Sequence, residues 1–194
     1  EALRDSLAWM LEANGHAVAV HESGEAFLAA CTPEMTGCVL LDVRMPGMSG
    51  LEVFEELGRR RCGLPVVFIT GHGDVPMAVS ALKQGAVDFV EKPFGEREML
   101  RVVEQCLRLE RETRDRRLQE ADTARRLGLL TQREREVLEL IIVGKLNKQI
   151  ADVLGISIKT VEVHRARVME KMGAHSLAEL VQHVVVLEPG AVPR

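Results

Sequence analysis

Short apolar runs alternate with amphipathic segments along the first hundred residues. Runs with the length and composition of buried strands occupy residues 16–20, 38–41, 65–70 and 86–90. Apolar positions with helical spacing lie between them and predict helices over residues 3–13, 24–30, 51–57 and 74–85, the last with Asp74 as its N-cap. Strands that alternate with helices of this length indicate a parallel sheet with helices on both faces.

The chain becomes helical throughout after residue 96. Residues 110–126 hold few apolar side chains, which is typical of a solvated helix or a linker. We therefore place a domain boundary inside this segment. An alternative is that the segment sets the distance between two modules or packs on a partner chain.

Four shorter helices are expected after the linker. Thr131 and Ser176 are each followed three residues later by Glu, the spacing of a capping box, and so begin the first and fourth of these helices. The second helix is expected over residues 147–154 and ends at Gly155, and the third runs from Ser157 to about residue 172. No strand pattern, internal repeat or low-complexity tract occurs in this half of the chain.

Composition places the chain among ordered globular proteins. Its 194 residues, 46% of them hydrophobic, suffice for one large or two small domains with buried cores. No stretch approaches the ~18 to 20 unbroken apolar residues of a membrane span and no signal-peptide pattern opens the chain, so we expect a cytoplasmic protein without membrane contact. The four cysteines form no CxxC pair and have no histidine at ligand spacing, which favours reduced structural thiols over zinc or disulfides.

The net charge of -4 conceals an asymmetry between the two halves. Residues 1–100 hold 15 acidic and 8 basic side chains, whereas residues 101–194 hold 14 acidic and 17 basic ones. An acidic half joined to a mildly basic half favours a regulatory module linked to a module that meets a polyanion.

Three polar residues lie at or beside the ends of three different predicted strands. They are Asp42, Thr70 and Lys92. Each has an ordinary explanation, since Asp is common in turns, Thr in strands and Lys in loops. In a parallel sheet, however, these ends share one edge, and a carboxylate, a hydroxyl and an ammonium group together suit phosphoryl transfer to an aspartate.

The first hundred residues closely resemble the receiver domain of two-component response regulators, a flavodoxin-like α/β fold. The resemblance rests on "LLDVRMPGMSG", "FITGHGD" and "FVEKPF", which match the receiver motifs in order and spacing. It implies that Asp42 accepts a phosphoryl group from a sensor histidine kinase and that Lys92 contacts this group. It also implies that Thr70 and Phe89 are switch residues and that the peptide bond before Pro93 is cis.

The resemblance further implies a Mg²⁺ ion bound by the Asp42 side chain and the backbone carbonyl of Arg44. In the family, two more ligands are acids at the end of a first strand, which comes just before the helix that here begins at residues 1–3. The chain starts too late to include them, so its amino terminus looks truncated. We therefore expect a sheet with a gap between residues 16–20 and 38–41, and weak phosphorylation of the chain as given.

The basic half contains a helix-turn-helix pattern over residues 147–172. Ala151 is small where two helices cross, Gly155 lies in the turn, and Ile150 and Val161 face inward. An ordinary helical hairpin would show the same apolar spacing. Basic side chains gather on and just before the third helix, however, which favours a surface that binds DNA.

Residues 127–186 resemble the four-helix LuxR-type output domain of the NarL/FixJ class of regulators. The resemblance rests on "LTQREREVLELI", "NKQIA" and "KTVEVHRARVMEKM", and it implies that the third helix enters the major groove of DNA. The phosphate-contact candidates are Lys148, Lys159, Arg165 and Lys171. The candidates nearer to base edges are Thr160, Glu162, Val163 and Arg167, and His164 lies on the same basic face.

These patterns predict a DNA-binding transcriptional regulator controlled by phosphorylation. We expect a receiver domain at 1–104, a helical linker at 105–126 and a LuxR-type domain at 127–194. The partners implied are a sensor histidine kinase, promoter DNA, RNA polymerase and, on phosphorylation, a second copy of the chain. We do not expect an enzyme, because a haloacid-dehalogenase-type phosphatase needs a second Asp where Arg44 stands. A pseudo-receiver that binds DNA without control by phosphorylation is the remaining alternative.

Overall fold

The computed structural model of the protein describes residues 2–71 and 75–185. The chain divides into two compact units, residues 1–113 and 114–194, and each is considered by itself. One long helix, α5 (Glu96–Gly128), begins in the first unit and ends in the second. No helix within the described ranges is both long and apolar enough to cross a membrane.

The described part of the first unit contains a three-stranded parallel sheet. Its strands are β1 (Val39–Asp42), β2 (Val66–Thr70) and β3 (Asp88–Glu91), in the order β1-β2-β3. All five residues of the central strand β2 are buried, as expected for a parallel strand covered on both faces. These strands begin and end within two residues of the predicted runs.

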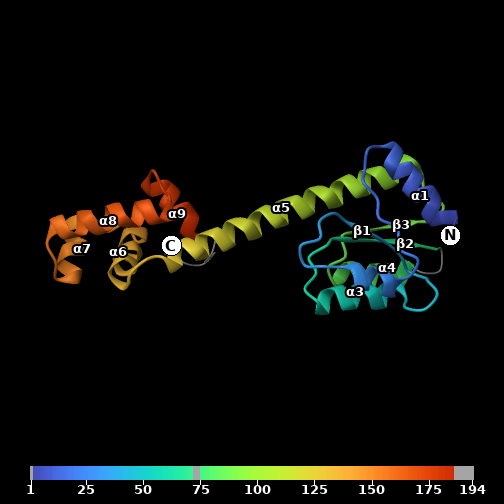
Figure 1. Cartoon of the computed structure of the whole chain (residues 1–194), viewed down its shortest axis with the longest axis horizontal. Coiled ribbons are helices and arrows are strands. Elements are labelled where there is room, and N and C mark those ends of the chain that lie inside the picture. Colours follow the sequence, from blue (N-terminus) through green and yellow to red (C-terminus); the bar gives the residue numbers. More distant parts are fainter. Residues whose placement is uncertain (1, 72–74, 186–194) are drawn as a thin grey trace. The chain divides into compact units, whose positions relative to one another are not determined.

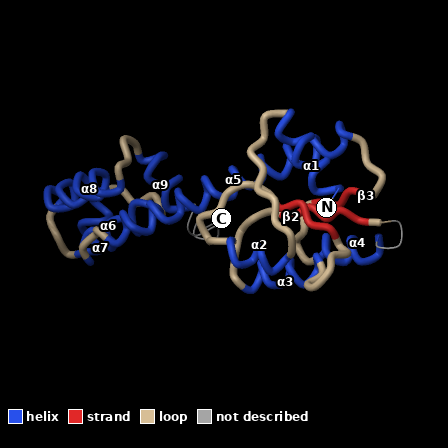
Figure 2. The backbone as a smooth tube through the Cα atoms, turned by 45° about the vertical axis from the view of Figure 1, so that its right-hand side comes forward, coloured by secondary structure: helices blue, strands red, loops and turns tan. Residues whose placement is uncertain are grey.

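Helices cover both faces of this sheet. Helices α1 (Ala2–Ala13) and α5 lie on one face, and α2 (Gly24–Ala30), α3 (Gly50–Arg59) and α4 (Val75–Lys83) lie on the other (Figures 1 and 2). The side chains of β2 alternate between two cores. Phe68 packs in the core of α2 and α3, whereas Val67 and Ile69 pack in the core of α1 and α5.

The strand predicted over residues 16–20 is wrong, because the structure has a loop there between α1 and α2. Val18 still packs against the core of α1 and α5, which explains its apolar character. A strand requires a neighbour that bonds to its backbone. Among the described residues β1 pairs only with β2, so the 16–20 segment has no strand beside it.

The predicted helices of the first unit are confirmed with small shifts at their ends. Helix α3 begins with a full capping box, in which the Ser49 hydroxyl accepts from the Glu52 amide and the Glu52 carboxylate accepts from the Ser49 amide. The expected N-cap of α4, Asp74, lies outside the described residues.

The second unit is helical throughout its described part. Helices α6 (Gln132–Ile142), α7 (Asn147–Leu154), α8 (Ile158–Met172) and α9 (Leu177–Val185) surround one apolar core. The capping box of Thr131 is confirmed, and Gly155 ends α7 in the left-handed conformation with φ of 64°. At α9 the box is only half formed, since the Glu179 carboxylate accepts from the His175 amide and not from Ser176.

The last turns of α5 are bonded to the end of α8. The Arg126 side chain donates to the Met172 carbonyl at 2.9 Å and is held from the other side by Asp122 at 2.6 Å. Carbonyl groups in the last turn of a helix lack partners within the helix, so the guanidinium of Arg126 satisfies one of them. The end of the linker helix is therefore part of the packing of the second unit.

Candidate functional sites

Asp42 and Lys92 meet at the carboxyl edge of the sheet. Asp42 is the last residue of β1 and Lys92 directly follows β3, and Lys92 Nζ lies 2.5 Å from Asp42 Oδ2. The other carboxylate oxygen, Oδ1, accepts from the Arg44 amide at 3.1 Å. About a quarter of the Asp42 side chain and a third of the Lys92 side chain are exposed, so a donor in solution can reach the pair.

The backbone holds Lys92 in this position. Its amide donates to the Thr70 carbonyl at 2.8 Å, which extends the pairing of β2 and β3 by one residue. The Lys92–Pro93 peptide bond is cis. The lysine side chain thus leaves the sheet at the edge where β1 ends.

Thr70 carries a buried hydroxyl at the same edge. The residue is fully buried, and its Oγ1 has no hydrogen-bond partner among the described residues. Buried polar atoms nearly always have a partner, so this hydroxyl is available to bond to a further group at the edge. Phe89 lies in β3, opposite Phe68 of β2, and is half-buried against the core of α2 and α3.

Glycine brings the start of α3 close to the end of β1. The Gly50 amide donates to the Val43 carbonyl at 3.1 Å, and a Cβ on Gly50 would lie 2.3 Å from the Asp42 carbonyl oxygen. Gly50, the last residue of "MPGMSG", is therefore required for this close approach of the two backbones.

Glu25 of α2 supports the loop that follows Asp42. Its carboxylate accepts from the Met48 amide at 2.9 Å. The backbone amides of Glu25 itself and of Met48 lower the pKa of this carboxyl. Sequence reasoning missed Glu25, because an acid in the first turn of a helix is ordinary and only the packing of α2 reveals its partner.

The described residues offer an incomplete set of ligands for a divalent cation. Among them, no group of three His, Cys, Asp or Glu side chains could hold a metal ion. Asp42 contributes one carboxylate and Arg44 one backbone carbonyl. Mg²⁺ is commonly held by one or two carboxylates with waters and phosphate oxygens, so these two groups fit part of such a site.

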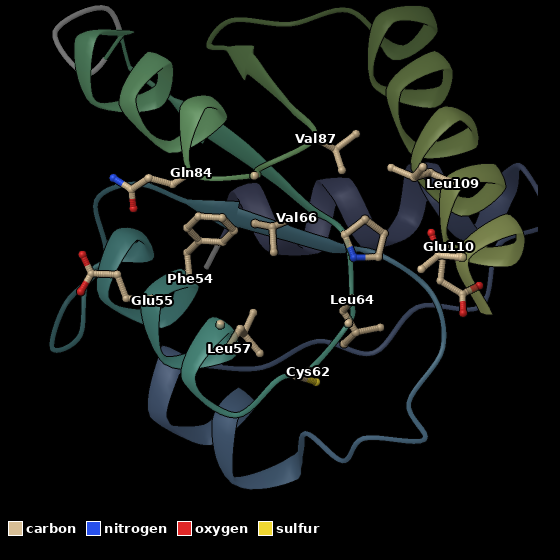
Figure 3. Close-up of a pocket in the computed structure, with 15 residues that line it drawn as sticks. Phe54, Glu55, Leu57, Cys62, Leu64, Val66, Gln84, Val87, Leu109 and Glu110 are labelled. Atoms are coloured by element: carbon tan, nitrogen blue, oxygen red, sulfur yellow. The ribbon is translucent and has the colours of Figure 1, made fainter. Parts of the chain in front are cut away.

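A cavity of about 430 Å³ lies away from this edge. It is lined by Leu64 just before β2, by Val87 just before β3, and by Leu109 and Glu110 of α5 (Figure 3). These residues are at the amino ends of the strands, whereas Asp42 is at a carboxyl end. The cavity is therefore separate from the Asp42–Lys92 pair.

Helices α7 and α8 present the predicted basic surface of the second unit. Of the residues that face inward, Ile150 and Val161 are fully buried, and Leu154 and Ile156 are partly buried against the same core. The candidates Lys148, Lys159, Thr160, Glu162, Val163 and Arg167 are exposed, and His164 and Arg165 are half-buried. The Thr160 hydroxyl lies 2.8 Å from the hydroxyl of Ser157, the N-cap of α8.

The ammonium group of Lys171 has two partners inside its own domain. Its ammonium group donates to the Glu134 carboxylate at 2.6 Å and to the Leu129 carbonyl at 3.1 Å. Glu134 is 2% exposed, and its carboxylate also accepts from the Thr131 amide at 2.8 Å. The bond from Lys171 is the main cause that lowers the pKa of Glu134 to about 2.

Two family models together cover most of the chain. The response regulator receiver domain matches residues 1–104, and the luxR family of bacterial regulatory proteins matches residues 128–184. Transcriptional regulatory protein FixJ of Azorhizobium caulinodans is 48% identical over 193 residues, which is 100% of this chain and 90% of that protein. The C4-dicarboxylate transport transcriptional regulatory protein DctR of Rhodobacter capsulatus is 45% identical over 94% of this chain and 93% of its own length.

Solved structures of response regulators are also similar to this chain. Response regulator StyR is similar with a TM-score of 0.85 and 45% identity, over 94% of this chain and 92% of that one. Full-length FixJ from B. japonicum is similar with a TM-score of 0.59 and 42% identity, over 96% of this chain and 92% of that one. With its receiver fold, its acid and lysine at the sheet edge and its helix-turn-helix, the chain belongs to the two-component response regulators of the NarL/FixJ class.

Proposed function

We propose that Asp42 receives the phosphoryl group that controls this transcriptional regulator, from a sensor histidine kinase. The observation that supports this most is the contact between the Asp42 carboxylate and the Lys92 ammonium at 2.5 Å, on a partly exposed sheet edge. The carboxylate would attack phosphorus and form an acyl phosphate, while the bond from phosphorus to the kinase histidine breaks and the imidazole leaves. The ammonium would then hold a phosphoryl oxygen. The phosphoryl group serves as a signal, so we propose a switch and not an enzyme.

Mg²⁺ would be held in part by the Asp42 carboxylate and the Arg44 carbonyl. When bound, the ion supplies positive charge that offsets the charge on the phosphoryl oxygens. The Lys92 ammonium supplies further positive charge from the chain itself.

Thr70 and Phe89 would convert the modification into a change of surface. The Thr70 hydroxyl is buried and has no partner in the described chain, so it can donate to a phosphoryl oxygen without breaking an existing bond. Movement of Thr70 would shift the populations of the side-chain conformations of Phe89 on the neighbouring strand. This change of surface would favour a homodimer of receiver domains. We assign this receiver to residues 1–104, the linker to 105–126 and the output domain to 127–194.

The output domain would place α8 in the major groove of promoter DNA, with α7 braced on phosphates. We propose that the candidates on α7 and α8 other than Lys171 contact DNA. Lys171 is omitted because its ammonium group is bonded to Glu134 and Leu129. A dimer would bind two half-sites of a promoter. We expect the protein to act in the cytoplasm, with RNA polymerase as a further partner.

Labelling with radioactive acetyl phosphate tests the acceptor. Asp42→Asn should take no label, whereas Asp88→Asn, which changes another aspartate of the same sheet, should keep it. Label on the wild type should be lost in hydroxylamine, as expected for an acyl phosphate. Undiminished label on Asp42→Asn would refute the assignment, whether the label on the wild type is weak or strong.

A further inference from the structure

Two cysteines that are far apart in the sequence meet in the first unit. Cys31 follows the last residue of α2 as its C-cap, and Cys62 lies in the connection from α3 to β2. Their Sγ atoms are 2.7 Å apart. Both cysteines are free thiols in this structure and both are partly exposed.

The surrounding bonds hold the two segments together. Arg60, just before Cys62, donates from its guanidinium to the Leu28 carbonyl of α2 at 2.6 Å. The Cys62 thiol also lies 3.6 Å from the Thr32 carbonyl. The two sulfur atoms are thus kept adjacent by contacts on both sides of the pair, and not by chance proximity of two mobile side chains.

We propose that Cys31 and Cys62 are a redox modification site, which a hydroperoxide converts reversibly into an intrachain disulfide. One sulfur attacks the peroxide oxygen, which gives a sulfenic acid and releases water. The other sulfur then attacks this sulfenic sulfur, and a second water leaves as the S–S bond forms. In sum, two thiols and one hydrogen peroxide give one disulfide and two waters, and a dithiol reductant returns both thiols.

Either sulfur can react first, because both cysteines are partly exposed. Burial and the bond to Cys62 raise the pKa of the Cys31 thiol, and a thiol of raised pKa reacts more slowly because the thiolate is the reactive form. Both orders of attack lead to the same disulfide.

The other two cysteines form a natural comparison. Cys38 and Cys106 are also hydrogen-bonded to each other, but Cys106 is fully buried in the core of α1 and α5. A peroxide in solution reaches partly exposed sulfur far more readily than buried sulfur. Cys38 is itself partly exposed, but its partner is buried, so of the four cysteines only Cys31 and Cys62 form a pair in which both residues are partly exposed.

The disulfide would tie the end of α2 to the connection between α3 and β2. Cys62 also lines the cavity at the amino ends of the strands (Figure 3), so the cross-link lies away from Asp42. Closing a loop of about thirty residues should raise the midpoint of thermal unfolding of the receiver by on the order of 10 °C. This inference is independent of the proposal for Asp42.

Peptide mapping of the whole chain after treatment with hydrogen peroxide tests the proposal. Free thiols should fall from four to two, and a non-reducing digest should contain one linked peptide pair with Cys31 and Cys62, which dithiothreitol separates. Cys31→Ser and Cys62→Ser should each lose the linked pair, and Cys38→Ala should keep it.

Three results would overturn the proposal. They are a Cys38–Cys106 link in place of the expected one, cross-links only between chains, and oxidation of Cys62 to sulfinic acid without a link. Because the linked peptide is sought first in the wild type, a variant that folds poorly does not affect the conclusion.

Discussion

Lys171→Met should destabilise the second unit by removing the ammonium group bonded to Glu134. The Glu134 carboxylate is 2% exposed, and its pKa is lowered from 4.5 to about 2. This shift corresponds to roughly 3 kcal/mol at neutral pH. The Thr131 amide would still hold the carboxylate and Lys171 itself is a third exposed, so we expect a loss of about 2 kcal/mol.

The pH dependence has a definite sign. The folded pKa of Glu134 is depressed, so its stabilising effect is fully present above the unfolded value near 4.5 and is lost as the pH falls toward about 2. The difference between the wild type and Lys171→Met should therefore be largest at neutral pH. It should shrink as the pH falls from 4.5 toward about 2, the window that these pKa values set.

Native-state hydrogen exchange measures the stability of each unit separately in one experiment. A loss of about 2 kcal/mol should speed exchange of the most protected amides of α6 and α8 by roughly 30-fold, and leave those of β2 unchanged. Lys148→Met removes an exposed ammonium group of the same unit and should change exchange little. A difference that is the same at pH 7 and pH 3 would refute the electrostatic reasoning and point to packing of the lysine stem.

The remaining predictions concern the receiver and the DNA-binding surface. Gly50→Ala should lower receiver stability by about 1 to 3 kcal/mol in urea denaturation, because its Cβ would meet backbone at 2.3 Å, whereas Gly58→Ala has open space and should not destabilise. Thr70→Ala should keep near-normal labelling and fail to dimerise on phosphorylation in sedimentation velocity, and a normal dimer would exclude its switch role. Across a panel of operators at two salt concentrations, Arg167→Ala should relax preference at one position by roughly 1 to 3 kcal/mol. Lys148→Ala should weaken all sequences alike and reduce the salt slope by about 1, so a uniform loss for Arg167→Ala would place that residue on a phosphate.

Local sequence signals predicted most element boundaries. The box of Thr131 and Glu134, the turn at Gly155 and the cap at Ser157 are found where the sequence placed them. These signals depend on bonds between residues three or four apart, so they are readable without knowledge of the fold. The strand predicted at residues 16–20 is wrong, because a strand depends on pairing with a neighbour that is distant in the sequence and not on local bonds.

The convergence of Asp42 and Lys92 could also be predicted, since the strand–helix alternation indicates a parallel sheet and a parallel sheet gathers its carboxyl ends at one edge. The sequence could not show that the Thr70 hydroxyl is buried without a partner in the described chain. Nor could it show that Glu25 holds the loop after Asp42, because that bond depends on where α2 packs.

Apart from the strand expected at residues 16–20, the sequence by itself determined the order of the elements, most of their caps and the edge at which the polar residues gather. The tertiary structure alone decided which side chains become partners. It joined Lys171 to Glu134, 37 positions apart, and Cys31 to Cys62, 31 positions apart. Pattern and capping act over a few residues, whereas such pairs depend on the packing of whole helices, which no local window of sequence contains.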